Sequence, residues 1–243
     1  MFVLDTSKLR PDTQHLWETL RWHSGLRGFV LIGGTALALR IGHRLSEDLD
    51  FAYNGRKLPK RQIQAMVRDL QQRGTALVLN QPATEIDEFI NAGLDLYDFQ
   101  QNFDGNETVK VSLVCLDTPA NSILKGTPDD MLRVATLDEI FALKALVVAS
   151  RSKTRDWFDL YVLMTRHGYS AADFLRAFHL HDADHLLDSA VMRLRHAKPA
   201  IADAGYDALL EDAPSLETMR DFFNATLDEL EAERSRAVFT RTR

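Results

Sequence analysis

The chain has 243 residues, of which 45% are hydrophobic and 26% charged, and its formal net charge is −6. This charge balance argues against a protein that coats nucleic acid nonspecifically, because such binding requires an excess of Lys and Arg. Cys115 is the only cysteine, which excludes an internal disulfide. No signal-peptide pattern and no membrane-length apolar run is found, so we expect an unprocessed cytoplasmic protein without a membrane partner.

The first half of the chain predicts a mixture of helices and strands. Apolar spacing predicts helices over residues 12–24, 35–42 and 60–74. Short apolar or alternating runs predict strands at residues 28–32, 48–53, 75–80, 93–100 and 108–116. Asp104-Gly105, between the last two strands, is typical of a hairpin turn.

After Pro128 the sequence reads as helical. Thr136 and Glu139 have capping-box spacing at the start of a helix over 135–150. Further helices are predicted over 154–168, over 170–179 and in later stretches to about residue 234. Gly and Pro in residues 124–131 indicate a boundary there. We therefore expect a mixed α/β domain at 1–126 and a helical domain at 127–243.

The predicted strand at 28–32 is followed by Gly33 and Gly34, and a helix begins at once. Free N–H groups and the dipole at a helix N-terminus favour phosphate, and missing side chains allow its close approach. The Thr35 hydroxyl adds a polar group at the same point. A tight turn that needs glycine only for packing is the alternative explanation.

Asp48 and Asp50 lie one residue apart on the predicted strand at 48–53 and so point to one face. Two carboxylates this close repel each other unless a cation lies between them. Oxygen ligands of this kind suit Mg²⁺, which binds through one or two carboxylates plus substrate phosphates. Together with the glycines, they predict a phosphate site beside a metal site, as nucleotidyl transfer requires.

These residues also carry a family resemblance. The stretch "GGTALALRIGHRLSEDLDF" (33–51) resembles the first motif of the polymerase-β-like nucleotidyltransferases, and the match within them is to the AbiEii/AbiGii toxin family. The stretch "LDEIFALKALVVASRSKTRDWFDLYVL" (137–163) is similar to that family's C-terminal motif. Together the two blocks anchor most of residues 28–165.

The resemblance implies an α+β fold, in which a minimal nucleotidyltransferase sheet with helices is followed by a helical domain that completes the active-site cleft. It implies a nucleoside triphosphate (NTP) as substrate, with Mg²⁺. Relatives are toxins of toxin–antitoxin and phage-defence systems, and some modify tRNA 3′ ends. A cognate antitoxin and an RNA acceptor are therefore the expected partners.

The motifs also imply roles for single residues. Gly33, Gly34 and Thr35 would contact phosphates, and Asp48 and Asp50 would hold the metal. Lys144 would contact the triphosphate, and Asp156 would be the later acidic residue of the site. Arg44 and His43, near the metal strand, are candidates to orient the substrate, or to cap the preceding helix.

Each role in the second motif has an alternative. Lys144 lies in the apolar run "IFALKALVV", where a lysine either meets an anion or extends its ammonium to solvent. Asp156 could instead cap its helix, and Asp159 is the second choice for the catalytic carboxylate. Asp159 could also pair with Arg151 or Arg155 for structural reasons.

One departure from the superfamily concerns a third carboxylate on a later strand. The best-placed strand here, 109–115, offers Lys110 and Ser112 instead. Three other acidic residues could substitute: Asp95, Asp98 and Asp117. The sequence therefore does not identify the general base, and Asp156 is one candidate for this role.

Three functional hypotheses follow. The first is nucleotide transfer to RNA, with Arg151, Lys153 and Arg155 as a basic patch. The second is the same chemistry on a protein hydroxyl (AMPylation) or on a small molecule such as an aminoglycoside. The third is a degenerate enzyme that binds nucleotide or a partner protein without turnover.

Overall fold

A computed structural model describes residues 4–126, 131–196 and 213–241 of the chain. The chain divides into two compact units, residues 1–140 and 141–243. The predicted boundary segment at 124–131 includes residues 127–130, which lie outside the described residues. The same holds for residues 197–212 within the predicted helical half. Each unit is described by itself.

The strands of the first unit form one six-stranded sheet in the order β3-β4-β5-β2-β1-β6. The strands are β1 (Phe29–Ile32), β2 (Leu49–Tyr53), β3 (Leu77–Leu79), β4 (Gln100–Gly105), β5 (Val109–Cys115) and β6 (Arg133–Val134). β2 pairs in parallel with β5, and β1 with β6, whereas all other neighbours are antiparallel. The predicted α+β class with a mixed sheet is confirmed.

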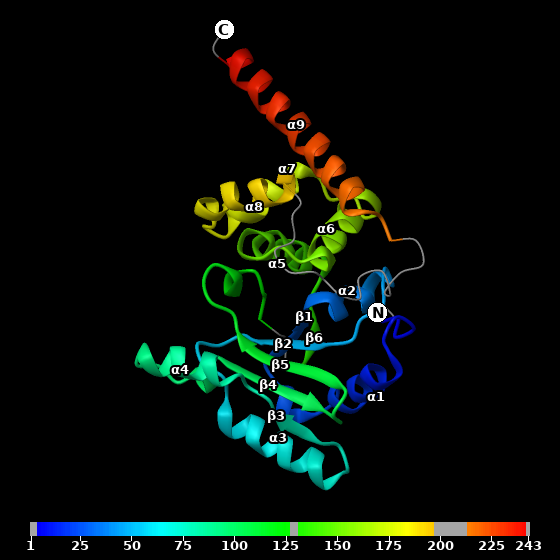
Figure 1. Ribbon diagram of the computed structural model, residues 1–243, viewed down its shortest axis with the longest axis vertical. Helices are drawn as coiled ribbons and strands as arrows, with labels where there is room; N and C mark the ends of the chain where they lie inside the picture. The colour runs from blue at the N-terminus through cyan, green and yellow to red at the C-terminus, as the bar shows by residue number, and fades with distance from the viewer. Residues whose placement is uncertain (1–3, 127–130, 197–212, 242–243) are drawn as a thin grey trace. The chain divides into compact units, whose positions relative to one another are not determined.

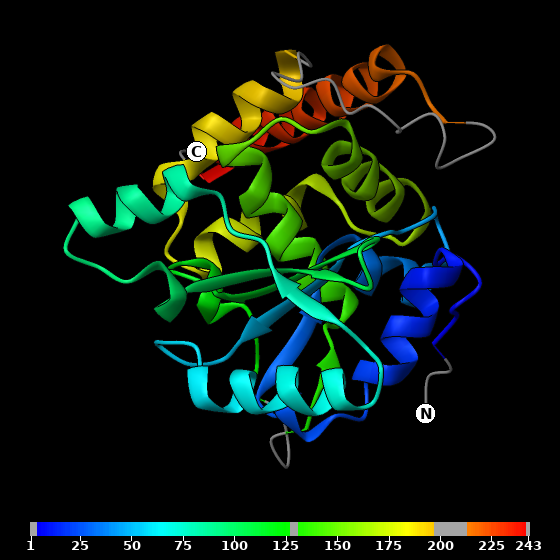
Figure 2. The same cartoon turned by 60° about the horizontal axis from the view of Figure 1, so that its bottom comes forward.

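One face of this sheet forms the core of the first unit. Phe103 and Val111, paired across β4 and β5, are 4% and 1% exposed. α1 (Pro11–Leu20) brings Leu16 against Gly105 on this face. α3 (Lys60–Gln72) lies next to β3 in Figure 1 and crosses the foreground of the sheet in Figure 2. The amphipathic spacing predicted for both helices is what allows them to cover this face.

The predicted strand at 93–100 is wrong. α4 (Ala83–Asn91) precedes this segment, and a short 3₁₀ helix forms at Leu96–Asp98. The Asp95 carboxylate accepts a hydrogen bond of 2.9 Å from the Tyr97 N–H, which turns the chain. The hairpin also differs in detail, since β4 continues to Gly105 and the turn falls at Asn106 and Glu107, both with positive φ.

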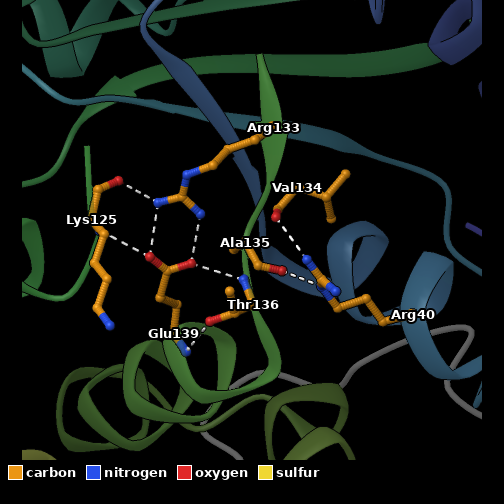
Figure 3. Close-up of polar contacts among 7 residues, drawn as sticks. All are labelled: Arg40, Lys125, Arg133, Val134, Ala135, Thr136 and Glu139. Atoms are coloured by element: carbon orange, nitrogen blue, oxygen red, sulfur yellow. Dashed lines mark hydrogen bonds and ion pairs between the residues drawn. The ribbon is translucent and has the colours of Figure 1, made fainter. Parts of the chain in front are cut away.

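α5 (Leu137–Ser150) begins with the predicted capping box. The Glu139 N–H donates to Thr136 Oγ1 at 3.2 Å, and the Thr136 N–H donates to the Glu139 carboxylate at 2.8 Å. The same carboxylate accepts from the Lys125 N–H at 2.9 Å and from both terminal nitrogens of Arg133 at 2.7 and 2.8 Å (Figure 3). Burial opposes its ionisation, but Arg133 and the two N–H groups hold the pKa of Glu139 below its usual value.

Replacing Glu139 with glutamine should lower the free energy of unfolding by about 2–3 kcal/mol. Glu139 is only 4% exposed, and one of its oxygens would become an NH₂ group among donors that need an acceptor. Urea denaturation would measure the change. Glu231→Gln is the control, because Glu231 pairs with Arg195 while 66% exposed, and it should change stability by under about 1 kcal/mol. Equal effects of the two substitutions would contradict the central role of Glu139.

The second unit is helical, as predicted. Besides most of α5 it contains α6 (Thr154–Arg166), α7 (Ala171–Leu180), α8 (Asp184–His196) and α9 (Leu216–Arg241). Trp157 of α6 meets Phe223 of α9 edge to face at 6.2 Å, and both rings are almost fully buried. In the parts of the chain that the structure describes, no helix is both long and apolar enough to cross a membrane.

Candidate functional site

The turn from β1 into α2 (Gly33–Ile41) places a helix N-terminus beside a carboxylate. Gly33, the first residue of the helix, has a φ of +74°, which only glycine adopts without strain. The antiparallel pairing of β1 and β2 puts Ile32 opposite Asp50. A Cβ on Gly33 would lie 2.8 Å from Asp50 Oδ2, closer than van der Waals contact allows. The absence of a side chain at Gly33 therefore allows the Asp50 carboxylate to lie directly against the first turn of α2.

The second glycine makes room for a cation. A Cβ on Gly34 would collide with the guanidinium of Arg44, which is buried at 4% exposure. Arg44 Nη1 donates to the Leu45 carbonyl at 3.0 Å, which helps to fix its direction. A guanidinium against the first turn of a helix adds positive charge where the helix dipole is already positive. The combination favours an anion at this point.

Thr35 has a structural contact that the sequence did not reveal. It is buried, and its hydroxyl donates to the Asp48 carbonyl while meeting Ser46 Oγ at 2.7 Å. These contacts fix the backbone that carries Asp48 to the first turn of α2. Ser46 is thus a further supporting residue of the site, and only the folded structure brings it to Thr35.

The two aspartates lie where β2 begins. Asp48 directly precedes the strand, Asp50 is its second residue, and both are half-buried. The parallel pairing with β5 places Ser112 in register with Asp50, and β4 brings Asn102 in register with Ser112. The residue of β5 beside Asp50 is therefore Ser112, which has a neutral hydroxyl where many enzymes of the superfamily have a third carboxylate.

The other acidic candidates for that position do not fill it. Asp95 and Asp98 form ion pairs with Lys60 at 2.7 and 2.5 Å, and Asp98 also pairs with Lys57. Asp117 follows the end of β5, at the opposite end of the strand pair from Asp48. Within the described ranges, no group of three or more His, Cys, Asp or Glu residues could hold a metal ion.

Replacing Gly33 with alanine should reduce stability by about 1–2 kcal/mol, because the new Cβ meets Asp50 and the positive φ is strained. It should also lower the nucleotide transfer that the family resemblance implies. Gly74→Ala is the matched control. Gly74 has a φ of +86° with nothing within 4 Å of its Cβ position. Gly74→Ala should reduce stability by about as much as Gly33→Ala and leave transfer unchanged. Equal losses of transfer, measured as label incorporated per minute, would contradict a role for the Gly33 turn.

The second motif forms a buried cluster of charges in the second unit. Lys144 Nζ lies 2.7 Å from Asp156 Oδ1 and 2.6 Å from Asp159 Oδ2. These three side chains are 8%, 3% and 0% exposed. Arg151 Nε donates to Asp156 Oδ2 at 2.7 Å from a side chain that is 51% exposed. Lys144 thus meets anions within its own unit, and Arg151 pairs with Asp156.

The cluster also fixes the ionisation of Asp156. Its burial alone would raise the pKa of this carboxyl, because burial disfavours the charged form. Lys144 and Arg151 outweigh burial and hold the pKa of Asp156 below its usual value. The structure therefore brings the site residues together in two groups, one in each unit: Gly33, Gly34, Thr35, Arg44, Asp48 and Asp50 in the first, and Lys144 and Asp156 in the second.

One protein family and several known proteins are similar to this chain. The family model described as "Nucleotidyl transferase AbiEii toxin, Type IV TA system" matches residues 16–240. An uncharacterized protein of Aquifex aeolicus, aq_aa25, is 29% identical over 170 residues, which cover 67% of this chain and 70% of that protein. Among solved structures, JHP933 from Helicobacter pylori is 21% identical with a TM-score of 0.43, over 90% of this chain and 91% of that one. A "putative nucleotidyltransferase" from H. pylori is 21% identical with a TM-score of 0.46, over 90% and 95%.

Proposed function

Because the chain belongs to the AbiEii family of nucleotidyl transferase toxins, we propose that it transfers a nucleotide from an NTP to RNA with the help of Mg²⁺. The observation that carries the proposal is the close approach of the Asp50 carboxylate to the Gly33 turn at the N-terminus of α2. The N-terminus of α2, the buried guanidinium of Arg44 and the Asp50 carboxylate meet at this turn, and Asp48 lies two residues before Asp50. This is a set of groups that suits a metal-bound phosphate.

The donor set fits magnesium. Asp48 and Asp50 supply hard oxygen ligands, and a two-carboxylate site leaves the remaining positions to water and to phosphate oxygens. When bound, the metal would neutralise phosphate charge and orient the α-phosphorus for attack. Asp48 and Asp50 would hold it, and Thr35 would keep Asp48 in place through its backbone carbonyl.

The remaining residues act on the triphosphate. Gly33 and Gly34 would offer backbone N–H groups to phosphate oxygens, and Arg44 would add positive charge beside them. Lys144 and Asp156 would serve the same reaction, as the family's second motif implies. An acceptor hydroxyl attacks the α-phosphorus, a new O–P bond forms, the bond to the β-phosphate breaks, and pyrophosphate leaves.

The proposed acceptor is RNA, and tRNA is the first RNA to test. The basic segment 151–155 supports this choice, since Arg151, Lys153 and Arg155 lie there at least partly exposed. Because the family is described as a toxin of a type IV toxin–antitoxin system, we also propose a cognate antitoxin as partner.

The experiment incubates the purified protein with Mg²⁺, total tRNA and each of the four α-labelled NTPs in turn. Label in tRNA with one nucleotide, and none with Asp48→Ala, is the expected result and names the donor. Label on added protein or on an aminoglycoside, but not on RNA, would show that the acceptor is a protein or a small molecule and not RNA. Nucleotide binding without label on any acceptor would overturn the enzymatic proposal.

A further inference from the structure

A cavity of about 570 Å³ lies between α3 and the β3–β4 edge of the sheet. Its lining includes Gln101 and Phe103 of β4, which alternate with Asn102 along the strand. Asn102 shares a face with Ser112 and, through it, with Asp50. The cavity is therefore on the opposite face of the sheet from the Asp50 side chain and is a different site from the proposed catalytic one.

The inner wall of the cavity is apolar. Ile63 and Phe103 are 0% and 4% exposed, and Val67 and Leu79 line the same space. A volume of this size is within the usual range of small-ligand pockets. The ring of Tyr97, which is half-buried, adds an aromatic surface at the wall. A planar ring system fits such walls, because aromatic side chains stack on it.

Two side-chain amides line the same cavity. Gln101 is 8% exposed, and its Nε2 donates to the Tyr97 carbonyl at 3.1 Å, which fixes the direction of the amide. Gln64 is exposed on α3 and reaches the cavity from the other side. An amide offers both a donor and an acceptor, which is the chemistry that recognises the edge of a nucleobase.

The charged groups at the cavity favour an anion. Lys60 is held between Asp95 and Asp98, and Lys57 pairs with Asp98, so these four charges balance. Arg68 adds an exposed positive charge, and it forms no ion pair within the described ranges. A guanidinium without a carboxylate partner is well suited to bind phosphate.

We infer that this cavity is a nucleotide-binding site on the reverse face of the sheet, which takes a base against the apolar wall and a phosphate at Arg68. The ligand is a ring with an attached phosphate, supplied by a free mononucleotide or by one unit of single-stranded RNA. The inference is independent of nucleotide transfer, since none of the residues placed in the catalytic machinery lines the cavity.

The test measures binding of AMP by calorimetry and of a labelled six-residue oligoadenylate by anisotropy, both with EDTA to suppress metal-dependent binding. Leu79→Glu places a negative charge at the cavity and should weaken binding at least tenfold. Val78→Glu is the matched control, because Val78 is the adjacent residue of the same edge strand, is 58% exposed and does not line the cavity. It should weaken binding less than twofold.

A second pair of variants tests the phosphate contact. Arg68→Gln should weaken binding about tenfold and reduce the slope of log K against log salt by about 0.7 for the oligonucleotide. Arg73→Gln is the control, because Arg73 directly follows α3, pairs with Asp69 and does not line the cavity. Circular dichroism and urea denaturation confirm that each variant is folded.

The outcomes separate the two sources of the ligand. AMP binding that depends on Leu79 and Arg68 identifies a mononucleotide site, and dependence seen with the oligonucleotide alone identifies an RNA site. No binding of either probe, equal effects of Leu79→Glu and Val78→Glu, or equally strong binding of a polyglutamate peptide would overturn the inference. An enzyme that labels no RNA but still binds AMP here would leave this site intact and remove only the proposed transfer.

Discussion

Replacing Lys144 with methionine should lower the free energy of unfolding of the second unit by about 3–5 kcal/mol. Asp156 and Asp159, 3% and 0% exposed, both lie within 2.7 Å of the Lys144 ammonium. Methionine fills similar volume but removes the ammonium that lies against both buried carboxylates. Removal of one partner of a buried pair is costly because the remaining charge is uncompensated.

Two further variants define the cause. Arg151→Met should cost under about 1 kcal/mol, because Arg151 is 51% exposed and Lys144 still faces Asp156. Adding Asp159→Asn to Lys144→Met removes one of the two carboxylate charges and should recover much of the lost stability. If the double variant is no more stable than the single one, the loss comes from packing and not from charge. Urea denaturation followed by circular dichroism measures all three.

Replacing Asp50 with asparagine should reduce nucleotide transfer at least a hundredfold and leave the fold intact. Asparagine has nearly the shape of aspartate, so the Gly33 turn can keep its geometry. It removes one of the two carboxylates proposed to hold magnesium, and with it the charge that binds the metal. Label incorporation into RNA at saturating NTP is the measurement, with thermal unfolding as the check on folding.

Asp104→Asn is the matched control for this prediction. Asp104 lies on the same face of the same sheet, two residues from Asn102 on β4, and its carboxylate accepts from Asn80 at 2.7 Å. The substitution removes the same charge from that face without touching the Gly33 turn. Transfer by the Asp104 variant should stay within about twofold of the native protein. An equal loss in both variants would point to general electrostatics and remove the special role of Asp50.

Local patterns predicted much of the site. The glycines, the strand with Asp50 and the capping box of α5 each depend on residues close in sequence, and the structure has all of them. Helix α2 begins at Gly33, two residues earlier than expected, and β2 begins at Leu49, so Asp48 lies just outside it. Despite these shifts, the Gly33 turn and Asp50 lie side by side, because β1 and β2 are neighbours in the sheet.

The errors arose where tertiary contacts or local side-chain bonds overrode the pattern. The alternation of "LDLYDF" suggested a strand, but the bond from the Tyr97 N–H to Asp95 makes a turn there. Helix α4 was not predicted. None of its residues is buried, so core packing imposes little apolar spacing on this segment. The partners of Thr35 and the register of Ser112 with Asp50 depend on strand pairing, which the sequence alone does not specify.

The buried charges of the second unit were only partly predicted. A lysine within an apolar helix predicted either contact with an anion or an ammonium that extends to solvent, and Lys144 lies against two carboxylates. Its predicted contact with the triphosphate stays a prediction. The helical spacing of Asp156 and Asp159 placed both carboxylates on one face of α6. The sequence could not decide which of them meets Arg151, because that depends on the path of the segment between α5 and α6.

The most direct test of the account counts the products of one reaction. Purified protein, Mg²⁺, RNA and the NTP that labels it are incubated, and pyrophosphate and incorporated label are measured in the same samples over time. Nucleotidyl transfer predicts one pyrophosphate for each nucleotide incorporated, and neither product with Asp50→Asn. Release of inorganic phosphate with a nucleoside diphosphate would show cleavage at the γ-phosphate and would contradict nucleotidyl transfer at this site.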